Sequence, residues 1–398
     1  MYNLCHDGTL PAGVGAVFYG IFLLSEELDV NSIREEKKEM KNMKKVTPVI
    51  VTMIIFLLAV LTCSCSPAEE KKAPAKTVTI TDSAGRTVEV PQPLERVIVL
   101  SSDHAVPLKC IGVSPDKVVG ISEYIAGDKE ILPEISKKTQ VGSSFDPNLE
   151  KIVELNPQVI FAYVKWPGPE KLEKKLPGEI KVVRLDLYKP ETMEREIKLL
   201  GRMFGQEEEA EKYAGFWFSK IEAIEKKVKD LKEGERVRVY YEHGAKPYHT
   251  CSQGSGYHQL VEMAGGINIA RGLVGGYPEV DPEWVIEQNP GVIIRDLYGH
   301  AGFGNPDAGP LKKSAESLKE RPGFGEIKAV KEGKVYTFAH SLWGGAFKNI
   351  GACYLAKVFY PELFKDLDPE KYLKEHMEKY LGVEYERAKG AFIYPELK

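Results

Sequence analysis

Short apolar runs alternate with helical stretches along most of the chain after residue 77, in two groups. The first group covers residues 96–100, 117–121, 158–163 and 181–186. The second covers residues 236–242, 291–296 and 334–338. Apolar strands that alternate with helices are typical of parallel sheets covered on both faces, so each group predicts an α/β lobe. Before them, the runs at 78–81 and 86–90 flank a Ser-Ala-Gly turn and predict a hairpin.

A longer amphipathic segment separates the two groups. A short helix is expected from Pro190 to about Phe204, and a second one beyond Gly205 to about Lys232. In the second half of the longer helix, five apolar residues recur at spacings of 4, 3, 4 and 3: Trp217, Ile221, Ile224, Val228 and Leu231. This spacing places them on one face. At about 1.5 Å per residue, the helix would be a rod of roughly 40 Å, long enough to join two lobes.

The predicted fold class is therefore α/β, with two lobes that have parallel central sheets, joined by one long rigid helix, and a ligand cleft between them. The expected parts are a first lobe at 77–187, a helical linker at 188–233, a second lobe at 234–346 and a helical C-terminal cap at 347–398.

The two lobes share a short motif. Residues 146–150 read Asp-Pro-Asn-Leu-Glu, with Asn-Pro at 156–157; residues 281–284 read Asp-Pro-Glu-Trp, with Asn-Pro at 289–290. Asp and Pro are expected to open a helix as N-cap and first-turn residue, and Asn-Pro to end it before an apolar strand. A generic turn repeated by chance is the alternative, but matching positions in both lobes favour a pseudo-symmetric protein.

Composition restricts the function classes. The 398 residues include 54 Lys and Arg and 58 Asp and Glu, a net charge of −4, which argues against nucleic-acid binding because that needs an excess of clustered cations. The length suggests about two domains. Cys110, Cys251 and Cys353 have no metal-site spacing, so three buried thiols are expected rather than a disulfide.

The N-terminal region has the pattern of a secretory signal. Two lysines at 44–45 precede an apolar run at 46–61, so residues 44–65 are expected to be a signal peptide, with an uncleaved anchor as the alternative. Residues 1–43 fit poorly before such a signal and are expected to be an upstream extension, with translation starting at Met40 or Met43. Residues 66–76, rich in Glu, Lys, Pro and Ala, predict a disordered tether.

The end of the signal resembles the lipobox of prokaryotic lipoproteins. Cys65 follows the small Ser64 but lacks an aliphatic residue three positions earlier, whereas Cys63 has Val60 there but follows the larger Thr62. The resemblance implies a lipid anchor on Cys65 or Cys63, on the extracytoplasmic face of the cell membrane.

An ordered set of motifs resembles a known family. Residues 78–108, the two repeated motifs and Gly265-Gly266 before Ile267-Asn268 are similar to the solute-binding proteins of ABC importers for ferric siderophores, haem and cobalamin. The resemblance runs from about residue 77 to about 365. It implies a monomeric carrier without enzymatic activity or an intrinsic cofactor, which captures a solute and delivers it to a permease dimer with a cytoplasmic ATPase.

The same resemblance suggests two docking residues. Family members carry one acidic residue on each lobe that meets arginines of the permease, and the matching positions are Glu150 and Glu283. The alternative is that each carboxylate only complements a helix dipole, worth about 0.3–1 kcal/mol.

Ligands of such folds meet the loops at the carboxyl ends of the strands. Six histidines fall in these loops: His104, His243, His249, His258, His300 and His340. The loops also hold aromatic residues: Trp166, Tyr248, Tyr257, Tyr277, Tyr298, Phe303 and Trp343. The expected ligand contacts are His104, Phe145, Trp166, His249, Tyr277, Arg295, His300 and Trp343. Tyr277 is similar in position to an aromatic residue that packs on cobalamin in corrinoid binders. Whether a histidine ligates metal directly stays open, since a hydrogen-bonded loop residue is the alternative for each one.

Charge narrows the ligand class. The loops offer few cations, which argues against a strongly anionic catecholate and favours a metal chelate of modest charge, an iron complex or a corrinoid. A small oxyanion such as molybdate or tungstate, or a free metal, is the alternative. A metal-dependent hydrolase or chelatase is a weaker hypothesis because His-Glu-x-x-His, a phosphate loop and a nucleophile elbow are missing.

Overall fold

The computed structural model describes residues 76–244 and 246–397. They belong to one compact unit, Pro74–Lys398. The expected upstream extension, the signal peptide, both candidate anchor cysteines and all of the tether except Lys76 lie outside the described residues. Within the described part of the chain, no helix combines the length and the apolar character needed to cross a membrane.

The first lobe is built on a five-stranded parallel sheet of order β5-β4-β3-β6-β7. Its strands are β3 (Val97–Val99), β4 (Val118–Ile121), β5 (Thr139–Gln140), β6 (Val159–Ala162) and β7 (Lys181–Arg184). Its helices include α3 (Ser102–Cys110), α4 (Leu149–Leu155) and α5 (Pro190–Phe204). The predicted hairpin forms as the antiparallel pair β1 (Lys76–Thr81) and β2 (Thr87–Gln92).

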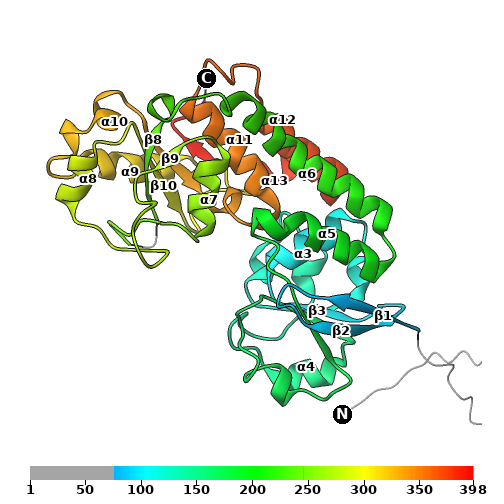
Figure 1. Cartoon of the computed structure of the whole chain (residues 1–398). Helices are drawn as coiled ribbons and strands as arrows, with labels where there is room; N and C mark the ends of the chain where they lie inside the picture. The colour runs from blue at the N-terminus through cyan, green and yellow to red at the C-terminus, as the bar shows by residue number, and fades with distance from the viewer. Residues whose placement is uncertain (1–75, 245, 398) are drawn as a thin grey trace, which may run out of the picture. The chain divides into compact units, whose positions relative to one another are not determined.

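The second lobe has a sheet of order β12-β11-β10-β8-β9; Figure 1 labels β8, β9 and β10 of this sheet. Its parallel strands are β8 (Arg238–Glu242), β9 (Ile267–Asn268), β10 (Val292–Leu297) and β11 (Val335–Ala339). Helices α7 (Gly256–Met263), α8 (Pro282–Gln288), α9 (Gly309–Lys319) and α10 (Lys328–Lys331) accompany them. The two predicted α/β lobes are thus confirmed.

The predicted joining helix is α6, which spans Glu207–Val228 and packs along α5 and α11 (Lys348–Phe359) (Figure 1). Its buried face includes the predicted Trp217, Ile221, Ile224 and Val228, and the Trp217 indole donates to the Ala346 carbonyl at 3.1 Å. The helix ends at Val228 rather than near Lys232, so its 22 residues extend over about 33 Å. One apolar core that includes this face continues into both lobes.

The repeated motifs form the expected helix ends, with one correction. Asn156 and Asn289 end α4 and α8 in the left-handed conformation, with φ of 44° and 43°. The N-cap of α4, however, is Asn148, whose side chain accepts from the Lys151 amide at 3.0 Å, and not Asp146. Asp281 is the N-cap of α8, but its side chain makes no capping hydrogen bond.

The C-terminal cap is not purely helical. It contains α11, α12 (Pro369–Glu375), a π-helical turn (His376–Leu381) and α13 (Tyr385–Ala388), but it ends in a strand, β12 (Ile393–Tyr394). This strand pairs antiparallel to β11 and extends the second sheet, which the helical expectation missed. The expectation of three buried thiols is confirmed for Cys110, Cys251 and Cys353.

Candidate functional site

Polar and aromatic residues gather at the carboxyl edge of the second sheet. His243, Tyr298 and His340 come directly after β8, β10 and β11, so the parallel strands bring all three to one edge. Tyr257 at the start of α7 and Tyr277 from the following loop complete this group. We call these five residues the aromatic cluster.

Ring contacts and hydroxyl groups hold the aromatic cluster together. The Tyr298 and His340 rings stack with centroids 3.8 Å apart and an interplanar angle of 26°. The Tyr298 hydroxyl lies 2.9 Å from both His243 Nε2 and the Tyr257 hydroxyl. Tyr277 meets His243 edge-on at 5.6 Å and is 47% exposed. Burial raises the pKa of Tyr277 to about 12, so the cluster presents neutral phenols.

A buried carboxylate orients His340. Asp296 Oδ2 lies 2.8 Å from His340 Nδ1, and Asp296 Oδ1 accepts from the Gly244 amide at 2.7 Å. Burial raises the pKa of Asp296, but the bonds from His340 and Gly244 outweigh it and hold the pKa below its ordinary value. With Nδ1 engaged, Nε2 is the ring nitrogen left for another partner.

Trp343 supports the aromatic cluster through Tyr241. It is 1% exposed and meets Tyr241 edge-on at 5.7 Å, while Tyr241 stacks on Tyr257 at 5.1 Å. The core encloses the Trp343 ring in this structure, and its role as a ligand contact stays a prediction.

Three aromatic rings are open to solvent on the first lobe. Tyr124, Phe145 and Trp166 are 55%, 50% and 57% exposed. The Phe145 ring lies edge-on to both neighbours, with centroids 6.4 Å away in each case. A hollow of about 420 Å³ is lined by Phe145, Trp166, Gly168 and Lys171. The structure thus brings the predicted Phe145 and Trp166 together.

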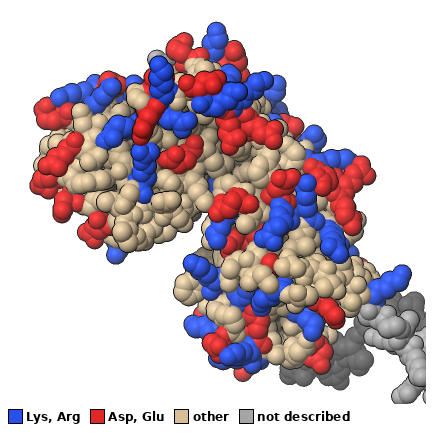
Figure 2. Space-filling model, in the orientation of Figure 1, with Lys and Arg blue, Asp and Glu red and all other residues tan. Residues whose placement is uncertain are grey.

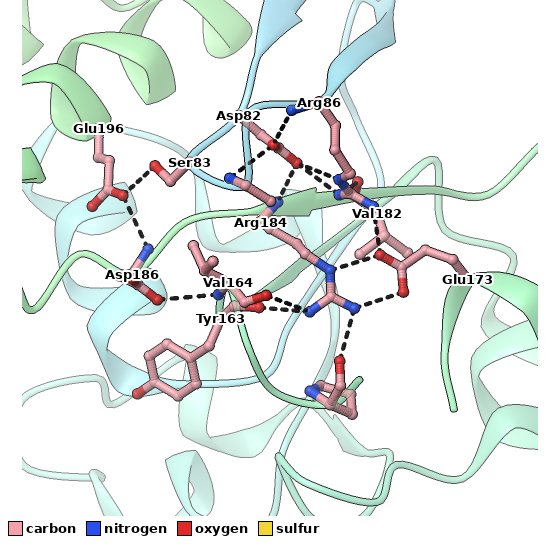
Figure 3. Close-up of polar contacts among 12 residues, drawn as sticks. Asp82, Ser83, Arg86, Tyr163, Val164, Glu173, Val182, Arg184, Asp186 and Glu196 are labelled. Atoms are coloured by element: carbon pink, nitrogen blue, oxygen red, sulfur yellow. Dashed lines mark hydrogen bonds and ion pairs between the residues drawn. The ribbon is translucent and has the colours of Figure 1, made fainter. Parts of the chain in front are cut away.

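A buried arginine fixes the loop that carries Trp166 (Figure 3). Arg184, 1% exposed, donates to the Tyr163 and Pro167 carbonyls at 2.7 Å each and pairs with Glu173 at 2.6 Å. Asp82 in turn accepts from the Arg184 amide at 3.2 Å and pairs with Arg86, which anchors the hairpin on β7. This network holds the loop on both sides of Trp166.

Polar contacts connect the two lobes near these edges. The buried Lys348 amine donates to the Tyr188 carbonyl, and Gln259 Nε2 donates to Glu191 at 3.0 Å. A Cβ at Gly345 would lie 2.1 Å from Asp103 Oδ1, so only glycine fits there. Burial lowers the pKa of Lys348 to about 8 and raises that of Asp103 to about 6.

Two further residues predicted as ligand contacts are engaged within the protein. His104 is fully buried, its Nε2 lies 2.8 Å from the Leu185 carbonyl oxygen, and burial lowers its pKa to about 4. Arg295 donates to the buried Glu242 at 2.8 Å and to Ser317 of α9 at 3.1 Å. Because neighbouring strand residues point to opposite faces, Arg295 lies on the face away from Asp296.

The other two predicted histidines lie outside the aromatic cluster. His249 Nε2 is 3.2 Å from Glu279 Oε2, and His300 is exposed, with its carbonyl accepting from Asn305. The sequence places the cluster residues His243, Tyr257, Tyr298 and His340 in the loops after the strands, but they are not among the expected ligand contacts. The available signal was their position, since three of them come directly after a strand.

Both predicted docking residues are exposed. Glu150 and Glu283 stand in the first turns of α4 and α8, the helices that follow the repeated motif. Lys, Arg, Asp and Glu are interspersed over the face drawn in Figure 2, without a large field of one sign. Among residues 76–244 and 246–397, no group of three or more His, Cys, Asp or Glu side chains is arranged to hold a metal ion.

Comparison with known proteins decides the family. The profile of the periplasmic binding protein family matches residues 97–341, more than half of the chain. The chain belongs to this family. It is therefore an extracytoplasmic solute-binding protein of an ABC transporter and not an enzyme, as the sequence resemblance implied.

Three relatives of this periplasmic binding protein illustrate its similarity. The molybdate-binding protein MolA of Haemophilus influenzae is 25% identical over 342 residues, 77% of this chain and 91% of its own. The vitamin B12-binding protein of Salmonella paratyphi A is 29% identical over 207 residues, 52% of this chain and 73% of its own. The crystal structure of the TroA-like protein FepB from Veillonella parvula has a TM-score of 0.67 at 28% identity, and covers 79% of this chain and 99% of its own.

The raised pKa of Asp103 predicts a pH dependence of stability. The folded state keeps a proton that the unfolded chain releases near pH 4, so the contribution of Asp103 to the free energy of unfolding should fall as the pH rises from about 4 through about 6. The loss should reach at most about 3 kcal/mol, less where solvent screens the carboxylate. In urea denaturation across pH 4–7, the stability of Asp103→Asn relative to the wild type should rise with pH over this range, whereas that of the exposed control Asp116→Asn should not. Parallel curves for all three proteins would contradict the prediction.

Proposed function

We propose that this periplasmic binding protein captures a metal chelate with a flat or apolar organic face, an iron-siderophore complex or a corrinoid, and delivers it to the permease dimer of its importer. The observation that carries the proposal is the set of solvent-exposed aromatic rings at loops after the strands of both sheets. Phe145, Trp166 and Tyr277 expose about half of their surface. An aromatic side chain buries about 150–250 Å² when covered, so a ligand that covered these rings would gain several kcal/mol.

The buried and partly buried cations are already bonded to groups of the protein, and this supports a ligand of modest charge. Arg184 is paired with Glu173, and Arg295 and Arg321 are both paired with Glu242. The Lys348 amine is buried against the Tyr188 carbonyl. Lys171 is the cation that lines the hollow beside Trp166. A strongly anionic ligand would need more uncommitted guanidinium groups than these.

One ring nitrogen of the aromatic cluster, His340 Nε2, suits a metal chelate. His340 is held by Asp296 through Nδ1, an arrangement that fixes the tautomer and the ring plane of metal-binding histidines elsewhere. The cluster has two histidines and three tyrosines, and therefore has nitrogen and oxygen atoms around stacked rings. This chemistry fits a chelate that presents both an apolar face and a metal with an exchangeable ligand.

A small oxyanion is the second candidate. MolA, which is similar over 77% of this chain, is a molybdate-binding protein by name. Oxyanions are bound by backbone amides and one or two cations, without a need for exposed rings. The exposed rings of both lobes would then have no role in binding, which is why the chelate is preferred.

A ligand panel with ring variants tests the choice. Hydroxocobalamin, haemin, ferrichrome, ferric enterobactin and molybdate should be titrated calorimetrically into the protein from residue 68 onward. One chelate should bind, and Trp166→Ala and Tyr277→Ala should each weaken it by about tenfold, since one lost aromatic contact removes about 1 kcal/mol or more. Leu363→Ala, which removes an exposed apolar residue elsewhere, should leave affinity unchanged. Saturable binding of molybdate alone, unaffected by the ring variants, would replace the chelate by the oxyanion.

We also propose that Glu150 and Glu283 dock on the permease. The double reversal Glu150→Lys and Glu283→Lys should abolish uptake of the bound solute in cells, because like charges would then face the permease arginines, while ligand affinity in vitro stays unchanged. The matched control is Glu154→Lys with Glu287→Lys, exposed carboxylates in later turns of the same helices. Full uptake by the first double variant, or equal loss in the control, would reject specific docking.

We further propose a lipid anchor on Cys65, or on Cys63, and a translation start at Met40 or Met43. Mass spectrometry of the native membrane-extracted protein should find a diacylglyceryl-modified cysteine at the mature N-terminus. Replacement of the modified cysteine by serine should release the protein from the membrane fraction. An unmodified N-terminus, or any peptide from residues 1–39, would contradict the corresponding part of this proposal.

A further inference from the structure

The end of the chain lies against the loop that follows β10. We call residues 385–394, which comprise α13 and β12, the C-terminal strap, and residues 298–305 the β10 loop. The β10 loop begins with Tyr298 of the aromatic cluster and contains the exposed His300. The strap lies beyond the family match, which ends at residue 341. It is therefore an element that the match to the family profile does not explain.

Backbone hydrogen bonds connect the strap to the β10 loop and to the second sheet. The Gly304 amide donates to the Ala388 carbonyl at 3.0 Å, and the Ala391 amide donates to the Asn305 carbonyl at 2.8 Å. One residue further, the Ala339 amide donates to the Phe392 carbonyl at 2.9 Å. Ala339 ends β11 and directly precedes His340, so the strap is bonded beside one residue of the aromatic cluster and to the loop that begins with another, Tyr298.

Close packing reinforces these bonds. A Cβ at Gly390 would lie 1.8 Å from the Gly302 carbonyl oxygen and 3.1 Å from that of Asn305, so the two backbones approach as closely as glycine permits. Phe303 packs on Phe347 at 4.8 Å and edge-on to Phe392 at 5.1 Å. The β10 loop therefore has both its backbone and its one large apolar side chain held by the cap and the strap.

The same region reaches the first lobe. Arg387 Nε of the strap lies 3.8 Å from Glu130 Oε2, and a Cβ at Gly304 would lie 2.6 Å from Glu130 Cγ. The strap, the β10 loop and a first-lobe side chain thus meet at one point. A change in the position of the strap would therefore alter contacts in both lobes.

We propose that the C-terminal strap positions the β10 loop, and with it Tyr298 and His300, for solute binding. Its residues act through the loop backbone and do not contact the solute. The effect on the loop stands on the contacts above, whereas its consequence for binding rests on the proposed function.

Hydrogen exchange by mass spectrometry on the ligand-free protein tests the effect on the loop. In Gly390→Ala, the new Cβ would meet the Gly302 carbonyl, so peptides that cover residues 298–305 should exchange about tenfold faster or more, with β8 peptides unchanged. Gly325→Ala is the matched control, because a Cβ at Gly325 has no atom within 4 Å. It should exchange like the wild type.

A second variant covers the case in which Gly390→Ala fails to fold. Ala391→Pro removes the amide that donates to the Asn305 carbonyl and should give the same local increase. Unchanged exchange of the β10 loop in a folded variant, or faster exchange spread evenly over the protein, would overturn the proposal, because a merely structural role predicts a uniform change.

Binding of hydroxocobalamin and haemin separates this proposal from the proposed function. Where the wild type binds one of these probes, Gly390→Ala should weaken it about tenfold with unchanged stoichiometry, and unaltered affinity alongside a loosened loop would reject the role in solute binding. If neither probe nor any other chelate binds the wild type, the chelate assignment fails, while the exchange result still decides whether the strap positions the loop.

Discussion

The apolar face of α6 is the constraint on which the two-lobed arrangement depends. Trp217, Ile224 and their neighbours bury this face against α5 and α11, and the core they belong to continues under both sheets. Because separation of the lobes would expose part of that core to water, the helices fix where the ends of the strands lie. The site residues are therefore positioned by packing that occurs well away from them.

Buried polar groups then set the loops that carry the rings. Arg184 satisfies carbonyl groups on either side of Trp166, and Asp296 bonds His340 and the Gly244 backbone. Such groups are costly to bury unless they are paired, so each one specifies a single loop conformation. Their commitment has a functional consequence, because charges that hold loops in place are not available to a ligand. The exposed aromatic rings of the two lobes are the groups that stay accessible to a ligand.

The C-terminal strap connects the second sheet to the β10 loop. The sheets, α6 and the repeated helix starts belong to the region that matches the family, whereas the strap extends the second sheet by one antiparallel strand. Its contacts to the β10 loop and to Glu130 join elements that the sheets alone leave independent.

The sequence by itself determined the two lobes, the joining helix and the helix ends at Asn156 and Asn289. Each of these depends on neighbouring residues alone: the alternation of apolar strands with helices, the spacing of apolar residues along one helix face, and an asparagine that can adopt the left-handed conformation. It also listed every residue of the aromatic cluster, since strand ends can be located from the pattern. Only the tertiary structure decided which of these residues face solvent. Trp166 and Trp343 are alike in sequence terms, yet one is open and the other enclosed by Tyr241 and Phe338. Arg295 and Asp296 are neighbours on opposite faces of β10, and what packs on each face comes from segments distant in the chain.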